Sequence, residues 1–187
     1  MSREFLRWQK AQRSASLTRS EPADLDLPLS EQWCREFLCT LENFSTRLPR
    51  QIIHRDPNPA NVIASADGWG FIDFELSELN VRIYDPCYTA LAILSESFAG
   101  SDQARLSLRL EICRNILRGY DCAAKHTQVE WAALPYIIAA HQLECTVWCS
   151  EQKRNTWMLE TNRRMALWLI ENWDRLKSQL DPTCREN

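Results

Sequence analysis

Glycine is scarce in this chain. Only four of the 187 residues are glycine, and the first of them is Gly68. A glycine-rich loop, in which backbone amides surround a phosphate group, is therefore absent before residue 51. The rest of the composition, 45% hydrophobic and 25% charged residues, is that of a globular domain with one substantial core.

The sequence also lacks a recognisable export signal. Its first residues, MSREFLRWQKAQRSAS, mix charged and apolar side chains and contain no apolar core of signal-peptide length. The most apolar long stretch, residues 131–149, is interrupted by Pro135, His141, Gln142 and Glu144, which favours burial in a protein core over a membrane span. We therefore expect a soluble, cytoplasmic protein that contacts no membrane.

Charge of one sign does not accumulate either. The chain carries 22 basic and 25 acidic residues and a formal net charge of −3, with no basic patch of the kind that a phosphate backbone requires. Nucleic acid is therefore excluded as an expected partner.

None of the eight cysteines forms a Cys-x-x-Cys pair, and without an export signal they are expected to be reduced thiols. His141, Cys145 and Cys149 share one helical face by spacing. Burial is favoured over metal binding for these three residues, because zinc sites usually draw ligands from two segments.

The pattern predicts three units: an N-terminal helix and linker over residues 1–29, a main domain over 30–182, and a tail over 183–187. Within the first unit, residues 3–13 are compatible with a helix. Ser30 precedes an apolar pattern of helical period that reaches about Arg47. Four further helices are predicted beyond residue 84, over residues 85–98, 102–122, 128–150 and 156–180.

Between residues 51 and 74 the apolar residues no longer follow a helical period. Short β-branched and aromatic runs flank an Ala-Asp-Gly turn at residues 66–68, which predicts a β-hairpin within residues 51–74. The expected fold class is therefore α+β and mainly helical, with a short hairpin packed on a helical bundle.

A polar loop directly precedes the first strand of this hairpin. Residues 54–61 read HRDPNPAN and match the H-R-D-x-x-x-x-N catalytic loop of protein kinases at every fixed position. Twelve residues after Asn61, an apolar strand ends at Asp73, where kinases place a second metal-binding carboxylate. Either motif alone is explained as well by a surface turn or a strand end as by a role in catalysis. The two motifs together, in this order across a hairpin, favour the catalytic and metal-binding interpretation.

Phosphoryl transfer requires these residue types. A carboxylate orients the acceptor hydroxyl and takes its proton, and oxygen ligands hold Mg²⁺ on the transferring phosphates. Asp56 is the candidate base, and His54 and Arg55 of the same loop are candidate catalytic residues. Asn61 and Asp73 are the candidate metal ligands.

The small number of residues between Asp73 and the next motif indicates which kinase-like family the chain resembles. Asp73 is followed after eleven residues by Asp85 in the sequence RIYDP, where protein kinases insert a long activation loop. This order resembles the aminoglycoside phosphotransferase and choline kinase family over roughly residues 30–180. The resemblance implies a protein-kinase-like C-terminal lobe that uses Mg²⁺ and ATP and acts on a small-molecule acceptor.

The resemblance also suggests roles for three neighbouring residues. His54 is similar to the residue that braces the loop from beneath. Asp85 is similar to the helix-start aspartate that accepts hydrogen bonds from the catalytic-loop backbone, a role compatible with ordinary helix capping. Glu75, common in the choline kinase branch, is a candidate contact for metal-bound water.

The sequence departs from the family pattern in two respects. Arg55 stands where the family more often has glycine, although arginine is the protein-kinase form. No glycine-rich loop and no strand lysine with a helix glutamate partner precede residue 51. We therefore expect an N-terminally truncated kinase whose missing lobe is supplied by a separate chain or covered by self-association; the alternative is a non-catalytic binding module of the same fold.

The acceptor is expected against the C-terminal helices. His141, Glu144, Trp148 and Glu151 fall at i, i+3, i+7 and i+10, close to one helical face. An acidic group beside an aromatic ring suits a cationic amine, which makes Glu144, Trp148 and Glu151 candidate substrate-binding residues. The alternative places Trp148 in the core and both glutamates in water.

Overall fold

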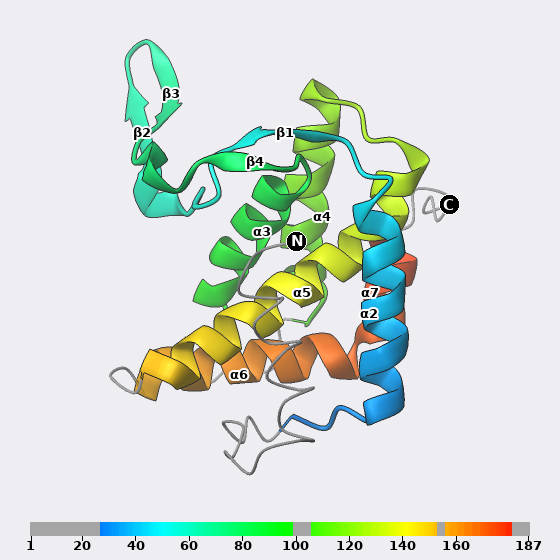
Figure 1. The fold of residues 1–187 in the computed structure, drawn as a ribbon. Helices are drawn as coiled ribbons and strands as arrows, with labels where there is room; N and C mark the ends of the chain where they lie inside the picture. The colour runs from blue at the N-terminus through cyan, green and yellow to red at the C-terminus, as the bar shows by residue number, and fades with distance from the viewer. Residues whose placement is uncertain (1–26, 99–105, 153–155, 181–187) are drawn as a thin grey trace.

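The computed structural model describes residues 27–98, 106–152 and 156–180 (Figure 1). The helix predicted over residues 3–13 and the predicted tail over 183–187 lie outside these ranges. The described chain is mainly helical and contains two small antiparallel sheets, which confirms the coarse fold class.

The elements follow one another with short connections. The helices are α2 (Glu31–Ser45), α3 (Tyr84–Glu96), α4 (Leu106–Ala123), α5 (Gln128–Gln152), α6 (Thr156–Glu171) and α7 (Trp173–Leu180). The strands are β1 (Arg50–Ile53), β2 (Val62–Ser65), β3 (Gly68–Phe71) and β4 (Glu78–Val81), with 3₁₀ turns η1 (Pro59–Asn61) and η2 (Phe74–Leu76).

The start of α2 agrees with its sequence signal. Ser30 is the N-cap, and its hydroxyl accepts a hydrogen bond of 3.1 Å from the backbone N–H of Trp33. Phe37 and Leu41, one turn apart, are buried on the inner face of the helix. Their rings and methyl groups pack into the same core as the later helices.

One hydrophobic core joins all the helices. α3, α4 and α5 each contribute fully buried side chains, and α6 and α7 close the core from the C-terminal side. Its members include Ile83, Leu94, Leu117, Leu134, Ile138, Met165 and Leu176. This packing fixes α3 and α5, the two helices that carry the candidate site.

The strand β4 was not predicted from the sequence. It pairs antiparallel with β1, with Ile52 opposite Leu79 and Ile53 opposite Glu78. Residues 78–81 form too short a run to be recognised alone, because their pairing partner lies far away in the sequence. This sheet connects the end of α2 to the start of α3.

The predicted hairpin is present but does not pack on the helices. β2 and β3 pair antiparallel, with Val62 opposite Phe71 and Ser65 opposite Gly68. Every residue of the two strands except Val62 is exposed, and the hairpin projects away from the helices in Figure 1. The prediction of a hairpin packed on the bundle is therefore wrong, because the sequence fixes the pairing of the two strands but not what covers them.

The single helix predicted over residues 156–180 is divided into α6 and α7. Asn172 separates them, and its side-chain amide donates to the carbonyl oxygen of Trp168 at 2.8 Å. The apolar period continues across the break because both helices face the same core. Among the described residues, no helix combines the length and the apolar character needed to cross a membrane.

Candidate active site

The start of α3 holds the backbone of the HRD loop. The Asp85 carboxylate accepts hydrogen bonds from the backbone N–H of His54 at 2.8 Å and from that of Arg55 at 2.9 Å. One turn further along α3, the Thr89 hydroxyl donates to the carbonyl oxygen of Pro57 at 3.1 Å. The loop is therefore fixed by a helix that belongs to the core.

Arg55 adopts a backbone conformation that favours glycine. Its φ angle is 73°, in the left-handed region, which costs a residue with a Cβ atom about 1–2 kcal/mol. The bond from its N–H to Asp85 helps to maintain this conformation, and its guanidinium Nε lies 3.3 Å from the Glu78 carboxylate. This conformation gives a physical reason why a related chain would carry glycine here.

His54 connects the loop to the segment that follows β3 and leads to Asp73. Its Nε2 lies 2.7 Å from the carbonyl oxygen of Ile72, and its Nδ1 accepts a 3.3 Å bond from the backbone N–H of Asp56. Because Nδ1 accepts, the proton is on Nε2, which donates to Ile72. The ring also packs against Phe74, with centroids 4.5 Å apart.

The Asp56 carboxylate is held by three side-chain donors. Its Oδ1 accepts from the Tyr88 hydroxyl at 2.6 Å and from Asn58 Nδ2 at 2.8 Å. Its Oδ2 accepts from Asn61 Nδ2 at 3.0 Å. Asp56 is only partly buried, so it is both oriented and accessible.

Asn61 and Asp73 lie on neighbouring segments. The backbone N–H of Ile72 donates to the carbonyl oxygen of Asn61 at 3.0 Å, so Asp73 directly follows the residue that pairs with Asn61. Both hydrogen bonds of the Asn61 amide use Nδ2, which leaves Oδ1 as the atom available to a cation.

The Asp73 carboxylate is exposed and makes no hydrogen bond or ion pair within the described parts of the chain. An amide oxygen and an uncommitted carboxylate are suitable ligands for Mg²⁺, which keeps several of its waters. Glu75, on η2, is exposed as well. Within residues 27–98, 106–152 and 156–180, no group of three or more His, Cys, Asp or Glu side chains is arranged to hold a metal ion. His141, Cys145 and Cys149 do not form such a group either.

A cavity of about 650 Å³ opens beside Asp56. It lies between the HRD loop and helices α3, α5 and α6, and its lining includes Asp56, Tyr88, Glu144, Trp148, Met158 and Met165. Glu144 and Trp148 therefore share one cavity with the candidate base.

Glu151 does not belong to this cavity. It is exposed on α5 and is not among the lining residues. Although Glu151 lies on nearly the same helical face as Glu144, seven residues of helix separate the two by about 10 Å along the axis. The cavity as described does not reach Glu151, and a substrate-binding role for Glu151 stays a prediction.

Two buried groups in the cavity wall remain uncharged at neutral pH. Burial, assisted by the positive charge of Arg55, lowers the pKa of His141 to about 4. Burial also raises the pKa of Tyr84, whose hydroxyl lies 2.9 Å from His141 Nδ1.

Tyr88 and Asn58 were not singled out from the sequence. Asn58 occupies an unspecified position of the loop motif, so the motif does not identify it. Tyr88 follows Asp85 by three residues and therefore lies on the same face of α3. This spacing could have identified Tyr88 from the sequence. Both residues contact Asp56 directly.

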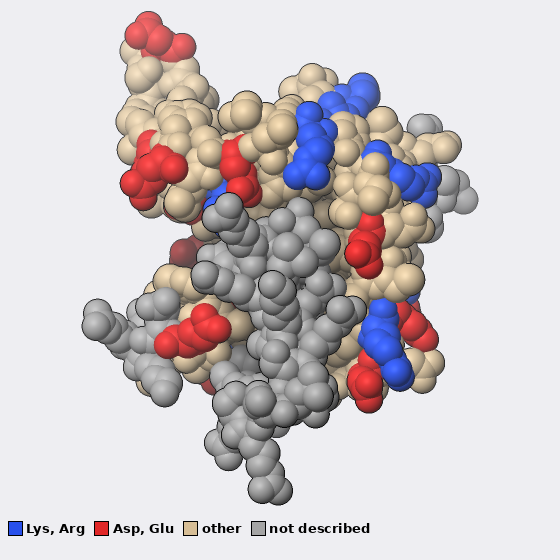
Figure 2. All heavy atoms as spheres, in the orientation of Figure 1, with Lys and Arg blue, Asp and Glu red and all other residues tan. Residues whose placement is uncertain are grey.

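Large apolar side chains are exposed along the segment that carries the loop and the hairpin. They include Ile52, Ile63, Trp69, Phe71, Ile72, Phe74, Leu76 and Leu79, and we call these residues the apolar face. No Lys or Arg occurs among residues 56–81, whereas five Asp and Glu residues do, and the projecting hairpin shows acidic but no basic side chains in Figure 2. Exposed apolar surface on this scale usually marks a contact with another polypeptide.

We predict that the purified chain self-associates through the apolar face and binds a dye that reports exposed apolar surface. Ile52 and Leu79, which are 70% and 61% exposed and lie opposite each other in the β1–β4 pair, are the residues to change. Replacing both with threonine should shift the association midpoint measured by sedimentation to higher concentration. Trp157→Thr is the matched control, because Trp157 is 61% exposed on α6, outside the apolar face. A wild-type chain that stays monomeric at high concentration without dye binding would refute the prediction.

Comparison with known families identifies the class of protein. The sequence profile of the phosphotransferase enzyme family (APH) matches residues 1–126, which is more than half of the chain, so the chain belongs to this family. The family resemblance drawn from the sequence is thus confirmed, although the match begins before residue 30 and ends before residue 180. The match includes the HRD loop, the hairpin and α3, and it ends before α5. No curated protein and no solved structure matches the chain significantly.

Proposed function

We propose that this chain is an ATP-dependent phosphotransferase that transfers the γ-phosphate to a hydroxyl group of a small molecule. The observation that carries the proposal is the position of Asp56, an oriented and accessible carboxylate at the wall of a cavity large enough for a metabolite. Family membership suggests the same reaction class.

Six polar residues in and around the loop have tasks in this proposal. Asp56 orients the acceptor hydroxyl and takes its proton. Asn61 Oδ1 and the Asp73 carboxylate would hold Mg²⁺, and Glu75 would contact a water of the ion. The ion, when bound, neutralises negative charge on the transferring phosphates. Asp85 and His54 maintain the loop geometry through the hydrogen bonds described above.

The cavity favours an acceptor that carries a cationic amine. Glu144 supplies negative charge, and Trp148 supplies a ring face in the same wall. Met158 and Met165 line the same cavity with flexible apolar side chains. An amino alcohol with an apolar body combines these features.

The apolar face supports a further part of this proposal. We infer that this face is covered by a polypeptide layer that carries the glycine-rich loop and the phosphate-binding lysine and presents basic side chains to the acidic hairpin. The 187 residues alone are then expected to turn over at least ~10³-fold more slowly than the ~1–100 s⁻¹ usual for kinases, because several preorganised charge-stabilising donors are missing.

Acceptor-dependent formation of ADP tests the proposal. Purified chain is incubated with Mg-ATP and a panel of amino alcohols and aminoglycosides, and the phosphorylated product is identified by mass spectrometry. We expect a product with at least one member of the panel, and loss of that product in Asp73→Asn. The absence of any acceptor-dependent product, or an equal yield from Asp73→Asn, would overturn the proposal.

A further inference from the structure

Tyr88 makes the shortest side-chain contact to the candidate base. Its hydroxyl donates to Asp56 Oδ1 at 2.6 Å from the second turn of α3. Its ring lies 4.5 Å from the ring of His141 and lines the acceptor cavity. The phenol is thus held from two sides, by α5 through the ring and by the loop through the hydroxyl.

The donors around Asp56 distinguish its two oxygens. A carboxylate oxygen offers about two acceptor sites. Among the residues that the structure describes, Oδ1 accepts two bonds, from Tyr88 and Asn58, whereas Oδ2 accepts one bond, from Asn61. Only Oδ2 therefore keeps an acceptor site for a further hydroxyl.

We propose that Tyr88 is a positioning residue that occupies Asp56 Oδ1 and thereby makes Oδ2 the oxygen that receives the proton of the acceptor. This inference rests on the proposed function. As the acceptor oxygen bonds to the γ-phosphorus, the bond from that phosphorus to the leaving ADP oxygen breaks, and the acceptor proton moves to Oδ2. Tyr88 keeps its own proton throughout and forms no covalent bond.

The surroundings of Tyr88 keep it a donor. Burial, followed by its hydrogen bond to the Asp56 carboxylate, raises the pKa of Tyr88 well above its ordinary value. Its hydroxyl consequently remains protonated at every pH at which a kinase works. A protonated phenol with a short bond to a carboxylate restricts rotation of that carboxylate, as charge-assisted bonds are stronger than neutral ones.

The contact is first tested without reference to activity. In a chain labelled with ¹³C at the tyrosine ζ-carbon, the resonance of Tyr88 is identified by its absence from Tyr88→Phe. Replacing Asp56 with alanine should shift this resonance upfield, because the phenol then loses its anionic acceptor. The resonance of Tyr84, whose hydroxyl faces His141, should not move comparably. An unchanged Tyr88 resonance in Asp56→Ala would overturn the inference even if the chain is an active kinase.

The second test uses turnover. Tyr88→Phe should lower kcat about 10-fold and leave the KM for the acceptor nearly unchanged, since a single hydrogen bond to the base is lost and the ring remains. Tyr120→Phe is the matched control, because Tyr120 lies on α4 and does not line the cavity, and it should keep kcat within about twofold. Equal kcat in wild type and Tyr88→Phe, or equal losses in both variants, would refute a positioning role. If the wild type shows no acceptor-dependent turnover, the proposed function fails, and the resonance of Tyr88 still decides whether the phenol holds Asp56.

Discussion

Replacing Asp56 with asparagine is expected to lower the rate of phosphotransfer by about 10³-fold. Asparagine keeps the shape of the side chain but cannot take a proton, and a positioned general base contributes roughly 10²- to 10⁴-fold. The loss should appear in kcat, because the acceptor cavity is formed mainly by α3, α5 and α6 and remains intact. Initial rates with Mg-ATP and the best acceptor of the panel measure the effect.

The hairpin provides a matched control for this change. Asp67 is exposed in the turn between β2 and β3, in the same segment of the chain. Within the described part of the chain its carboxylate makes no hydrogen bond, and its backbone N–H donates to the Ser65 hydroxyl. Asp67→Asn removes the same charge at a distance from the cavity and should leave the rate unchanged. A rate in Asp56→Asn within tenfold of the wild type would contradict the assignment of Asp56 as the base.

The sequence predicted the elements that depend on local signals. The Ser30 cap, the helical periods and the Asp-Gly turn all lie within a few residues of the structure they produce, and these elements are present. The pairing of β1 with β4 was missed because it joins residues 50–53 to residues 78–81 and has no local signal. The exposed position of the hairpin was also missed, since alternation of apolar residues shows which face is apolar and not what covers that face.

The residues of the candidate site also divide into those with a local sequence signal and those without one. The HRD loop and Asp73 were found because fixed spacing within one segment identifies them. Tyr88 and the cavity itself were missed because α3, α5 and α6, which surround the cavity, meet only in the folded chain. Glu151 was named as a candidate substrate-binding residue from helical periodicity, which describes direction around the axis but not distance along it. The roles of the site residues remain predictions.

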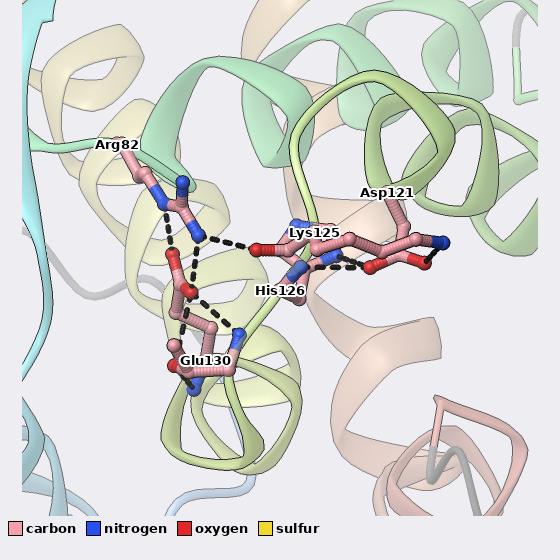
Figure 3. Close-up of polar contacts among 6 residues, drawn as sticks. Arg82, Asp121, Lys125, His126 and Glu130 are labelled. Carbon is pink, nitrogen blue, oxygen red and sulfur yellow. Dashed lines mark hydrogen bonds and ion pairs between the residues drawn. The ribbon is translucent and has the colours of Figure 1, made fainter.

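The ion pair between Arg82 and Glu130 is expected to have the largest effect on stability. The Arg82 guanidinium donates to both oxygens of Glu130, at 2.6 and 2.7 Å, and to the carbonyl oxygen of Lys125 at 2.6 Å (Figure 3). The Glu130 side chain is fully buried. Arg82 lies three residues before Asp85, so the pair joins the start of α3 to the start of α5.

Glu130 also caps α5. Its carboxylate accepts from the backbone N–H and the hydroxyl of Thr127, and the Thr127 hydroxyl accepts from the backbone N–H of Glu130. Burial alone would raise the pKa of Glu130, but the hydrogen bonds from Arg82 and Thr127 outweigh burial and lower it. The stability that this group contributes is therefore present above the ordinary carboxyl pKa near ~4.3 and is lost as the pH falls through the lowered value.

We predict that Arg82→Met lowers the free energy of unfolding at pH 7 by about 3 kcal/mol, because it leaves a buried carboxylate without its cation. The melting temperature should fall by roughly 10 °C for a chain of this size. Urea unfolding followed by circular dichroism measures the change, and the difference from wild type should shrink as the pH falls and Glu130 of the variant takes up a proton.

Two further variants decide whether the buried charge is the cause. Adding Glu130→Gln to Arg82→Met removes the unpaired carboxylate and keeps an acceptor for Thr127, so the double variant should regain more than half of the lost stability. Lys125→Met removes a neighbouring cation whose side chain is 78% exposed and pairs with Asp121, and it should have no measurable effect. If the double variant is instead less stable than Arg82→Met alone, the ion pair stabilises the fold through packing and not through the charge that it neutralises. In that case α3 and α5 would be joined by the volume of these side chains, and the pH dependence predicted for Glu130 would be absent as well.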